Sequence, residues 1–336
     1  MKAVGLPIEG EQKLAGLTME KPTPEGRDLL VEVKAVSVNP VDTKVRAGTE
    51  SDGRKDPKIL GYDASGVVSA TGPDCELFRL GDEVFYAGDV TRQGTNSQYH
   101  LVDERIVGRK PRKLDFAESA AMPLTSITAW EGLFERLSIN MGDQGNLDRS
   151  ILIIGGAGGV GSVAIQLAKL AGLNVIATAS REETIRWCRD LGADHILNHH
   201  QPLKPQLEAQ GLGEVDYLFC LSNTEYHWEN IGACIAPQGK ICLIVETGGS
   251  LPLDTLQGKS ATFAWEFMFT RSSYQTEDMI RQHQLLDRVA ELLDRGQIVT
   301  TLKETLRPIN AQNLRKAHER LESGQMIGKL VVEGFE

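Results

Sequence analysis

The sequence predicts a mixed α/β protein in which a doubly wound parallel sheet is inserted into a β-rich module. The first third carries short strand-like runs separated by turn residues. From near residue 120 the chain alternates apolar runs with helical patterns, which is typical of a parallel sheet. The tail returns to two amphipathic helices and a last strand. We therefore expect two domains, one of residues 1–122 plus 265–336 and one of residues 123–264.

The β-rich module is predicted from three short runs. Residues 29–36 alternate in part between apolar and polar, and residues 65–68 and 82–85 are shorter strand candidates. Gly72-Pro73 and Gly81-Asp82 mark turns among them. Short strands with frequent turns indicate a barrel-like or sandwich-like module.

The inserted module begins at residues 150–154, a continuous apolar run of the kind that is buried on both faces of a parallel sheet. A helix is predicted next, because apolar residues recur at the spacing of one helix face. Strand and helix then continue to alternate. The further predicted elements of this module are strands at 174–179, 215–220 and 240–245 and a helix at 182–191. The elements predicted in the tail are helices at 279–295 and 311–323 and a strand at 328–332.

Charge and composition narrow the partners and the compartment. The 336 residues carry a net charge of −10, which argues against nucleic acid or an anionic membrane surface as a partner. No apolar run reaches the roughly 20 residues that span a bilayer, and the N-terminus lacks the apolar core of a secretory signal. Five scattered cysteines without a C-x-x-C pair suit reduced thiols, so we expect a cytoplasmic protein.

A glycine-rich turn predicts dinucleotide binding. The pattern G-x-G-x-x-G lies directly between the strand at 150–154 and the helix that follows it. Glycines there permit a tight turn and a close approach to pyrophosphate, and the helix N-terminus offers that anion unpaired N–H groups. A glycine turn alone is weak evidence, but here the strand and the helix are both predicted. The cofactor-binding residues predicted in this turn are Gly156, Gly158, Gly159, Val160 and Gly161.

The end of the next strand predicts which dinucleotide binds. NAD-binding chains tend to place a carboxylate there, about 20 residues after the turn, to accept hydrogen bonds from the adenosine ribose. This chain has Ser180 and Arg181 instead, and both can donate to a 2′-phosphate. The alternative is that Arg181 is a solvated surface side chain, and Glu182 and Glu183 follow it immediately. We expect NADP(H).

Further motifs occur in a consistent order over nearly the whole chain. They are residues 38–42, 61–68, 81–84, 124–130, 158–161 with Gln166 and Lys169, and 328–332. Together they resemble the medium-chain dehydrogenase/reductase superfamily, and most closely its zinc-free, quinone oxidoreductase-like branch. Residues 265–270 resemble a subgroup named zinc-type alcohol dehydrogenase-like proteins. The resemblance implies a Rossmann domain inserted into a GroES-like catalytic domain, and a homodimer joined through an edge of the Rossmann sheet.

The resemblance also implies where a zinc site would lie. Zinc alcohol dehydrogenases hold the catalytic metal with a Cys, a His and a later Cys or His, and the motifs place Asn39, Tyr62 and Leu124 at those positions. None of the three is a usual zinc ligand. Residues 85–99, where four closely spaced Cys would bind structural zinc, contain no Cys. We therefore predict no metal.

A cluster of His195, His199 and His200 offers an alternative metal site by its spacing. These residues lie around the third strand of the predicted sheet, in a strand-loop segment that does not favour a metal. The resemblance implies instead that His199 lies near the adenosine end of NADPH.

Without a metal, alcohol oxidation lacks its usual means of stabilising an alkoxide. Quinones and α,β-unsaturated carbonyls accept hydride directly at carbon, so the protein mainly has to place the nicotinamide against the acceptor. The resemblance implies this reaction class, with a small electrophilic molecule as the substrate.

Three side chains are predicted near the nicotinamide from the family positions that they occupy. Asn39 can donate a hydrogen bond to a developing oxyanion. Tyr62 is either a hydrogen-bond or proton donor or an aromatic wall, since a phenol with a pKa of about 10 is a modest acid. Thr128 either contacts the nicotinamide or its ribose or is an ordinary hydroxyl at a helix start. We expect Asp42 to organise its loop rather than to act as a base.

Two other functions stay open from the sequence. An enoyl-thioester reductase of the same superfamily would use Tyr62 as an acid and would need a basic groove, for which Arg54, Lys55 and Lys58 are candidates. A non-catalytic NADPH-binding sensor would keep the cofactor site without turnover. No motif identifies the physiological substrate.

Overall fold

The protein divides into two units in the structure, a computed structural model. Unit 1 comprises Met1–Ile127 and Phe269–Glu336, and unit 2 comprises Thr128–Met268. The described residues are 1–8, 13–49, 56–142 and 144–335.

The chain passes between the units a few residues later than the sequence predicts. Residues 123–127 belong to unit 1, where the backbone N–H of Leu124 donates to Asp63. Residues 265–268 belong to unit 2, because strand β14 (Thr262–Trp265) pairs with its neighbour as far as Trp265. The predicted boundary after residue 122 would place the first part of helix α3 (Pro123–Trp130) in unit 2, and the predicted boundary after residue 264 would separate Trp265 from the rest of strand β14.

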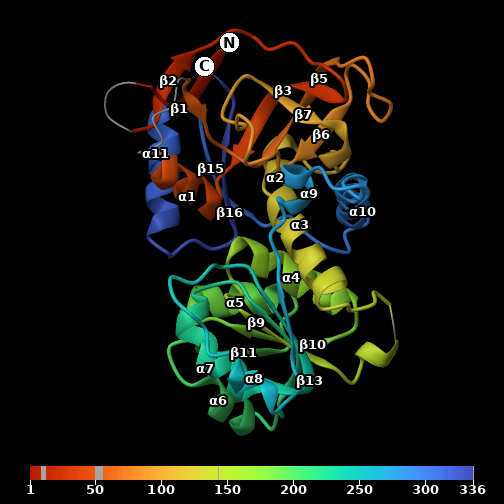
Figure 1. Cartoon of the computed structure of the whole chain (residues 1–336), viewed down its shortest axis with the longest axis vertical. Helices are drawn as coiled ribbons and strands as arrows, with labels where there is room; N and C mark the ends of the chain where they lie inside the picture. The colour runs from red at the N-terminus through yellow and green to blue at the C-terminus, as the bar shows by residue number, and fades with distance from the viewer. Residues whose placement is uncertain (9–12, 50–55, 143, 336) are drawn as a thin grey trace. The chain divides into compact units, whose positions relative to one another are not determined.

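Unit 2 is built on a six-stranded sheet in which all strands are parallel. Numbered from β9, the strand order is 3-2-1-4-5-6, the order of a Rossmann dinucleotide-binding domain. Figure 1 shows these strands with helices of the same unit around them. The strands are β9 (Ser150–Ile154), β10 (Asn174–Thr178), β11 (His195–Leu197), β12 (Val215–Cys220), β13 (Ile235–Leu243) and β14.

The central strand explains why this sheet is predictable from the sequence. Ile151 to Ile154 are all buried, as a strand covered by helices on both faces requires. The same helices bury their apolar faces on the sheet, so strand and helix alternate along the chain. The helical segments of unit 2 are η2 (Glu131–Arg136), η3 (Gln144–Asn146), α4 (Gly159–Leu170), α5 (Glu182–Asp190), α6 (Leu203–Ala209), α7 (Thr224–Cys234) and α8 (Asp254–Gln257).

Unit 1 contains the β-rich module. A seven-stranded sheet runs in the order β15-β16-β3-β5-β6-β8 with β7 also paired to β3, and a three-stranded sheet runs in the order β2-β1-β4. The strands are β1 (Lys2–Leu6), β2 (Ala15–Thr18), β3 (Asp28–Ser37), β4 (Lys58–Ile59), β5 (Ala64–Thr71), β6 (Glu83–Tyr86), β7 (Tyr99–Asp103), β8 (Val107–Arg109), β15 (Leu302–Leu306) and β16 (Lys329–Glu333).

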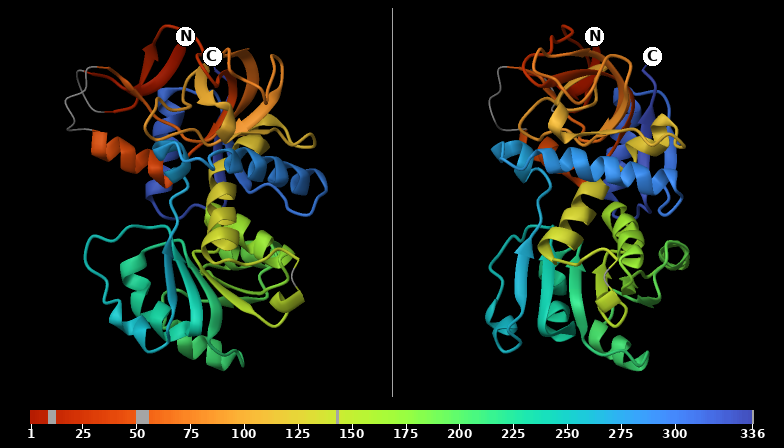
Figure 2. Two further views of the ribbon diagram at one scale, coloured as in Figure 1. Left: turned by 45° about the vertical axis from the view of Figure 1, so that its right-hand side comes forward. Right: turned by 90° about the vertical axis from the view of Figure 1, so that its right-hand side faces the viewer.

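Helices cover these sheets on the outside. Helix α10, drawn in blue in Figure 2, packs against β8. There Asp287 accepts a hydrogen bond from the backbone N–H of Arg109. The helical segments of unit 1 are α1 (Pro40–Thr49), η1 (Glu104–Ile106), α2 (Phe116–Ala120), the first part of α3, α9 (Thr270–Tyr274), α10 (Ile280–Asp294) and α11 (Ala311–Glu322).

Strand β3 brings three distant parts of unit 1 together. It pairs antiparallel with β16, with Val331 opposite Ser37, so that Lys329 lies beside the residues that follow β3. It also pairs antiparallel with β5, with Ala64 opposite Val36, which brings Asp63 to the same end. The candidate site of unit 1 is built at this end of β3.

The predicted elements fall on observed ones, with shifted ends. Strand β13 begins and ends earlier than residues 240–245. The sequence analysis predicted none of β1, β2, β4, β7, β8, β14 and β15, of which all but β1 lie at a sheet edge. An edge strand is only half covered, so it lacks the continuous apolar run that identifies a central strand. No helix in the described part of the chain is long and apolar enough to cross a membrane.

Candidate active site

The predicted phosphate-binding turn lies between β9 and α4, at the carboxyl end of the central strand of unit 2. Helix α4 has 12 residues, with Gly158 as its N-cap. A Cβ on Gly161 would lie 2.3 Å from the carbonyl oxygen of Gly155, so the close packing of turn and helix requires glycine. The turn therefore faces the N–H groups and partial positive charge of a helix N-terminus.

Gly158 differs from its neighbours because nothing in the protein requires glycine there. Its φ is −72°, and an added Cβ would meet only the carbonyl oxygen of Gly155, at an ordinary 3.5 Å. By contrast, a Cβ on Gly156 would lie 2.8 Å from the Cβ of Ala177. The backbone is thus left bare at Gly158 although the protein leaves space for a side chain there. This arrangement fits a pyrophosphate that approaches the backbone closely.

The residues predicted to select the dinucleotide follow β10. Ser180 is half-buried and Arg181 is exposed. The backbone N–H of Arg181 donates to Thr184 Oγ1 at 3.1 Å, which fixes the start of α5. The charge of Arg181 contributes to a lowered pKa of His199, after burial and the charge of His200. Two predicted cofactor residues, Arg181 and His199, therefore lie within electrostatic reach of each other.

The remaining cofactor predictions also lie in unit 2. Thr128 is buried in helix α3, and Gly159 and Val160 form the first turn of α4. Their contact with a cofactor stays a prediction.

In unit 1, Asn39, Asp63 and Lys329 form a buried hydrogen-bonded network. Lys329 Nζ donates to the Val38 carbonyl at 2.8 Å, to Asn39 Oδ1 at 2.5 Å and to Asp63 Oδ2 at 3.1 Å. Asn39 Nδ2 donates to Asp63 Oδ2 at 2.8 Å, and the backbone N–H of Leu124 donates to Asp63 Oδ1 at 2.8 Å. The ammonium has three protons, so each of its donors has an acceptor.

Burial and pairing act in opposite directions on the Asp63–Lys329 pair. Asp63 is 0% exposed and Lys329 is 3% exposed. Burial raises the pKa of Asp63 and lowers the pKa of Lys329. Their mutual attraction and the hydrogen bonds to the carboxylate oppose both shifts. The sequence analysis missed this pair, although a lysine in the apolar run of residues 328–332 was a usable signal.

The two predicted catalytic residues, Asn39 and Tyr62, differ in what their polar atoms meet. Asn39 Nδ2 also donates to the Ser37 carbonyl, at 3.4 Å, so both of its protons are used. The Tyr62 hydroxyl is buried and has no hydrogen-bond partner among the residues that the structure describes. The Tyr62 ring meets Phe269 edge-on, with ring centroids 5.6 Å apart. Of the two residues, Tyr62 is therefore the one whose side-chain donor, the hydroxyl, is not used by another described residue.

Asp42 organises the start of α1 as expected, but only with one oxygen. Its Oδ2 accepts the backbone N–H of Asn39 at 2.6 Å, while Oδ1 is buried without a described partner. Burial raises the pKa of Asp42 to about 7. Burial, followed by the negative charges of Asp42 and Asp89, raises the pKa of Tyr62.

The residues at the zinc-ligand positions do not fit a zinc ion. Zinc in proteins takes nitrogen, sulfur or carboxylate donors. Leu124 supplies no side-chain donor, Asn39 is committed to its network, and Tyr62 carries a phenol whose pKa is raised. Across the described residues, no group of three or more His, Cys, Asp or Glu side chains is arranged to hold a metal ion.

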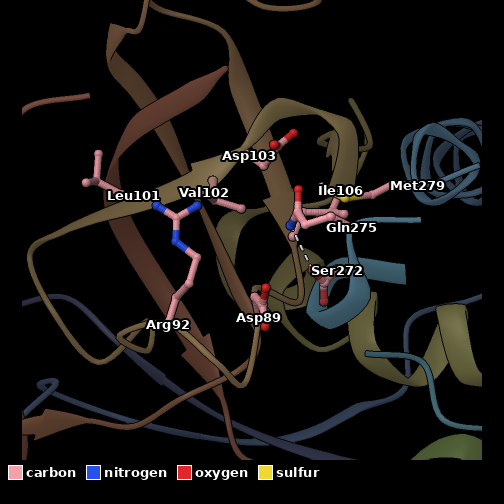
Figure 3. Close-up of a pocket in the computed structure, with 9 residues that line it drawn as sticks. All are labelled: Asp89, Arg92, Leu101, Val102, Asp103, Ile106, Ser272, Gln275 and Met279. Atoms are coloured by element: carbon pink, nitrogen blue, oxygen red, sulfur yellow. Dashed lines mark hydrogen bonds between the residues drawn. The ribbon is translucent and has the colours of Figure 1, made fainter. Parts of the chain in front are cut away.

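A small cavity lies elsewhere in unit 1 and has a different lining. Figure 3 shows Gln275 donating to the Ser272 carbonyl, at 2.7 Å, on one side of it. Arg92 lies on another side and donates to both carboxylate oxygens of Asp28. The cavity measures about 10 Å³, room for a single water molecule, so it does not hold a substrate.

Unit 2 buries a pair of acids that the sequence analysis also missed. Glu266 follows β14, and Arg136 Nε donates to its Oε2 at 2.8 Å. Arg136 Nη2 lies 3.9 Å from Glu131 Oε2. Burial, followed by the charge of Glu131, raises the pKa of Glu266 to about 9. One arginine therefore serves two acids, of which one keeps its proton at neutral pH.

Lys58, a candidate for a basic groove, is engaged within unit 1. Its Nζ donates to the carbonyls of Val90 and Arg92, at 3.4 and 2.6 Å. Arg54 and Lys55, the other two candidates, lie outside the described residues.

Comparisons with known proteins match both units. The alcohol dehydrogenase GroES-like domain model matches residues 25–127, and the zinc-binding dehydrogenase model matches residues 191–332. A Staphylococcus aureus (strain Mu50) protein named zinc-type alcohol dehydrogenase-like protein is 45% identical over 312 residues, 93% of this chain and 92% of that protein. A Rhizobium etli CFN 42 protein that carries the name of a zinc-dependent alcohol dehydrogenase has a crystal structure with a TM-score of 0.93 and 51% identity, covering 100% of this chain and 98% of that one.

More distant similarities include named reductases. The 2-methylene-furan-3-one reductase of Solanum lycopersicum is 29% identical over 315 residues, 90% of this chain and 71% of that protein. The structure of the quinone oxidoreductase from Coxiella burnetii has a TM-score of 0.80 at 25% identity, covering 100% of this chain and 99% of that one. The likeness thus extends through both units.

Proposed function

We propose that this chain, which belongs to the medium-chain dehydrogenase/reductase superfamily, transfers hydride from NADPH to a quinone or an α,β-unsaturated carbonyl without zinc. One observation carries the proposal. In the structure Asn39 is tied into a buried network with Asp63 and Lys329, and the motifs place Asn39, Tyr62 and Leu124 at the positions expected to hold the metal in zinc alcohol dehydrogenases. An acceptor that takes hydride directly at carbon is the class that such a site can serve.

Residues of unit 2 would hold the cofactor. The backbone of residues 156–161 and the N-terminus of α4 suit the pyrophosphate. Ser180 and Arg181 suit the 2′-phosphate, because β10 ends without a carboxylate. Thr128 and His199 are assigned to the nicotinamide half and the adenosine end. When bound, NADPH supplies the hydride.

A residue of unit 1 would donate a hydrogen bond to the acceptor's carbonyl oxygen, which gains negative charge as hydride is transferred. We assign it to Tyr62, whose hydroxyl has no described partner to give up. Asn39 would first have to release the Ser37 carbonyl, so its part is to position rather than to donate. The raised pKa of Tyr62 keeps the proton on the phenol, so the reduced product takes its proton from solvent.

The first test is cofactor oxidation at 340 nm with chelator-treated protein. NADPH and NADH are each compared with an ortho-quinone and with a simple enone as acceptor. We expect turnover with NADPH that survives the chelator. Activity lost to the chelator and restored by zinc would overturn the zinc-free mechanism, and tight NADPH binding without turnover would favour the sensor.

A second test separates the two roles of Tyr62. In Tyr62→Phe we expect kcat to fall about 100-fold, as on removal of one oxyanion donor, while the KM for NADPH stays the same. Tyr226→Phe is the matched control, since Tyr226 is 55% exposed in unit 2. A kcat for Tyr62→Phe within twofold of the wild type would leave Tyr62 as an aromatic wall.

We further propose that the chain is a cytoplasmic homodimer joined at β14. This strand is an edge of the unit 2 sheet, Trp265 on it is 45% exposed, and an uncovered edge is a template for pairing with a second copy. All five cysteines are free thiols, which suits a reducing compartment. Light scattering after gel filtration should show a dimer in the wild type and a monomer in Trp265→Glu, and a monomeric wild type would contradict the proposal.

A further inference from the structure

Three histidines of unit 2 gather beyond the carboxyl ends of its strands. His199 and His200 follow β11, and their ring centroids lie 4.4 Å apart. His227 lies in the second turn of α7, and the charges of His199 and His200 both act on it. In open α/β sheets, ligands bind outside this end of the strands. We call His199, His200 and His227 the histidine cluster.

Two nitrogens of the histidine cluster lack partners. The Nδ1 atoms of His199 and His227 are both buried, and neither makes a hydrogen bond with any described residue. His227 is 4% exposed, so water reaches its ring poorly. A buried polar atom without a partner costs free energy, and a ligand that supplies a partner recovers that cost. These nitrogens therefore point to a ligand.

The charged groups that act on the rings of His199 and His227 are Arg181 and the other histidines of the cluster. Burial, followed by the charges of His200 and Arg181, lowers the pKa of His199. Burial, followed by the charges of His199 and His200, lowers the pKa of His227 to about 4. No carboxylate is among the causes of either shift. Without a ligand, the rings of His199 and His227 are thus uncharged at neutral pH.

The acidic residues on the adjoining helices are engaged elsewhere or exposed. Glu182 at the start of α5 pairs with Arg186 at 3.1 Å. Glu225 in the first turn of α7 accepts the backbone N–H of Gly249 at 2.7 Å. Glu183 is exposed on α5. An anion that enters beside Arg181 therefore meets donors and protonatable rings.

We propose that the histidine cluster, together with Arg181, binds the 2′-phosphate of NADPH and takes up a proton as it does so. The inference rests on the proposed function, in which NADPH is the cofactor. A phosphate dianion favours the imidazolium form of a neighbouring ring, so a neutral ring, a proton and the phosphate combine into a charge-paired complex. NADH lacks this phosphate and draws no proton. Cofactor preference is therefore set by pH.

The direction of the effect follows from proton linkage. The complex holds more protons than the separate protein and cofactor at any pH between the lowered pKa of the histidines and their raised pKa beside phosphate. NADPH binding therefore tightens as pH falls through this range. For one proton the limit is about a tenfold change in Kd per pH unit.

The test measures Kd for NADPH and NADH from pH 5.5 to 8.5 by calorimetry, in two buffers with different ionisation enthalpies. We expect proton uptake and a falling Kd for NADPH at lower pH, and neither for NADH. A phosphate monoester itself gains a proton near pH 6. For that reason the pH slope has to be compared between wild type and histidine variants.

His199→Gln and His227→Gln should each reduce the proton uptake and flatten the pH slope of the NADPH Kd. His195→Gln is the matched control, because His195 lies on β11 itself and its Nδ1 has a partner, Gln210 Oε1, at 3.1 Å. Thermal melts check that the variants fold. If the buried position of His227 does not tolerate glutamine, the half-buried His199→Gln carries the test by itself.

Two failures are distinguishable. If the wild type binds NADPH no more tightly than NADH at every pH, the proposed cofactor is wrong. If NADPH is preferred but the pH slope and proton uptake are the same in all variants, the proton goes to the phosphate. That result would overturn the role of the histidine cluster and leave the proposed function standing.

Discussion

Each unit of the chain buries carboxylates, but Asp63 in unit 1 and Glu266 in unit 2 meet different partners. Asp63 has one buried cation, Lys329, whose three donors all have acceptors. Glu266 shares Arg136 with Glu131, and the Arg136 side chain is 33% exposed. Asp63 therefore contacts a buried cation directly, with Asp42 as a second buried acid nearby, while in unit 2 two buried acids share one partly exposed arginine.

The difference shows how direct contact with a buried cation bears on whether a buried acid forms an ion pair or keeps a proton. At Asp63, the charge of Lys329 and the hydrogen bonds to the carboxylate oppose the desolvation that raises its pKa, and the same contacts fix the geometry around Asn39. At Glu266, desolvation and like-charge repulsion win, and burial raises the pKa of Glu266 to about 9. The two clusters should therefore respond in opposite ways to loss of a charge.

The largest effect is expected from Lys329→Met. The substitution leaves Asp63 buried without its cation, and loss of one partner of a buried pair costs about 3–5 kcal/mol. The free energy of unfolding, from urea titration at pH 7.5, should fall by that amount.

The control for that prediction removes both charges at once. Asp63→Asn combined with Lys329→Met should recover much of the loss, because no buried charge is then left unpaired. A single variant within about 1 kcal/mol of the wild type would mean that Asp63 is already neutral, and the contrast between the units would vanish.

A smaller effect of opposite sign is expected from Glu266→Gln. The pKa of Glu266, about 9 in the fold, lies above its ordinary value of 4.5, so the folded protein binds more protons between these pH values. Stability is then greatest at low pH and falls as pH rises from 4.5 to 9. The amide should stabilise the protein by about 2–4 kcal/mol at pH 8 and by little at pH 4.5. Urea titrations at the two pH values measure this, and destabilisation at pH 8 would contradict the shared proton.

The smallest effect, from Asp42→Asn, tests the comparison inside unit 1. Asp42 lies near the paired Asp63 but keeps one oxygen without a described partner, and burial raises its pKa from 3.8 to about 7. Its contribution to stability therefore declines as pH rises from 3.8 to 7 and is constant above. The asparagine variant should gain about 2 kcal/mol over the wild type at pH 8 and nothing at pH 4. An equal difference at both pH values would indicate a packing effect instead.

Local signals in the sequence were enough to place the glycine-rich turn between a strand and a helix. The strand at 150–154, the glycines after it and the next helix are contiguous, and each is fixed by neighbouring residues. The glycine pattern was therefore readable, and in the structure Gly161 meets the constraint for which it was singled out. The histidine cluster was only partly readable, because His227 is far from His199 in the chain and only α7 brings it near.

By itself the sequence determined the two-part architecture, the parallel sheet that alternates with helices and the position of the phosphate-binding turn, because periodicity and glycine constraints act over a few residues. Only the tertiary structure decided which buried charges are paired. Asp63 and Lys329 are 266 residues apart and meet because β5 and β16 both pair with β3, and no local pattern encodes that register. Protonation follows from such contacts, since the pKa of a buried group depends on the neighbours that the fold supplies.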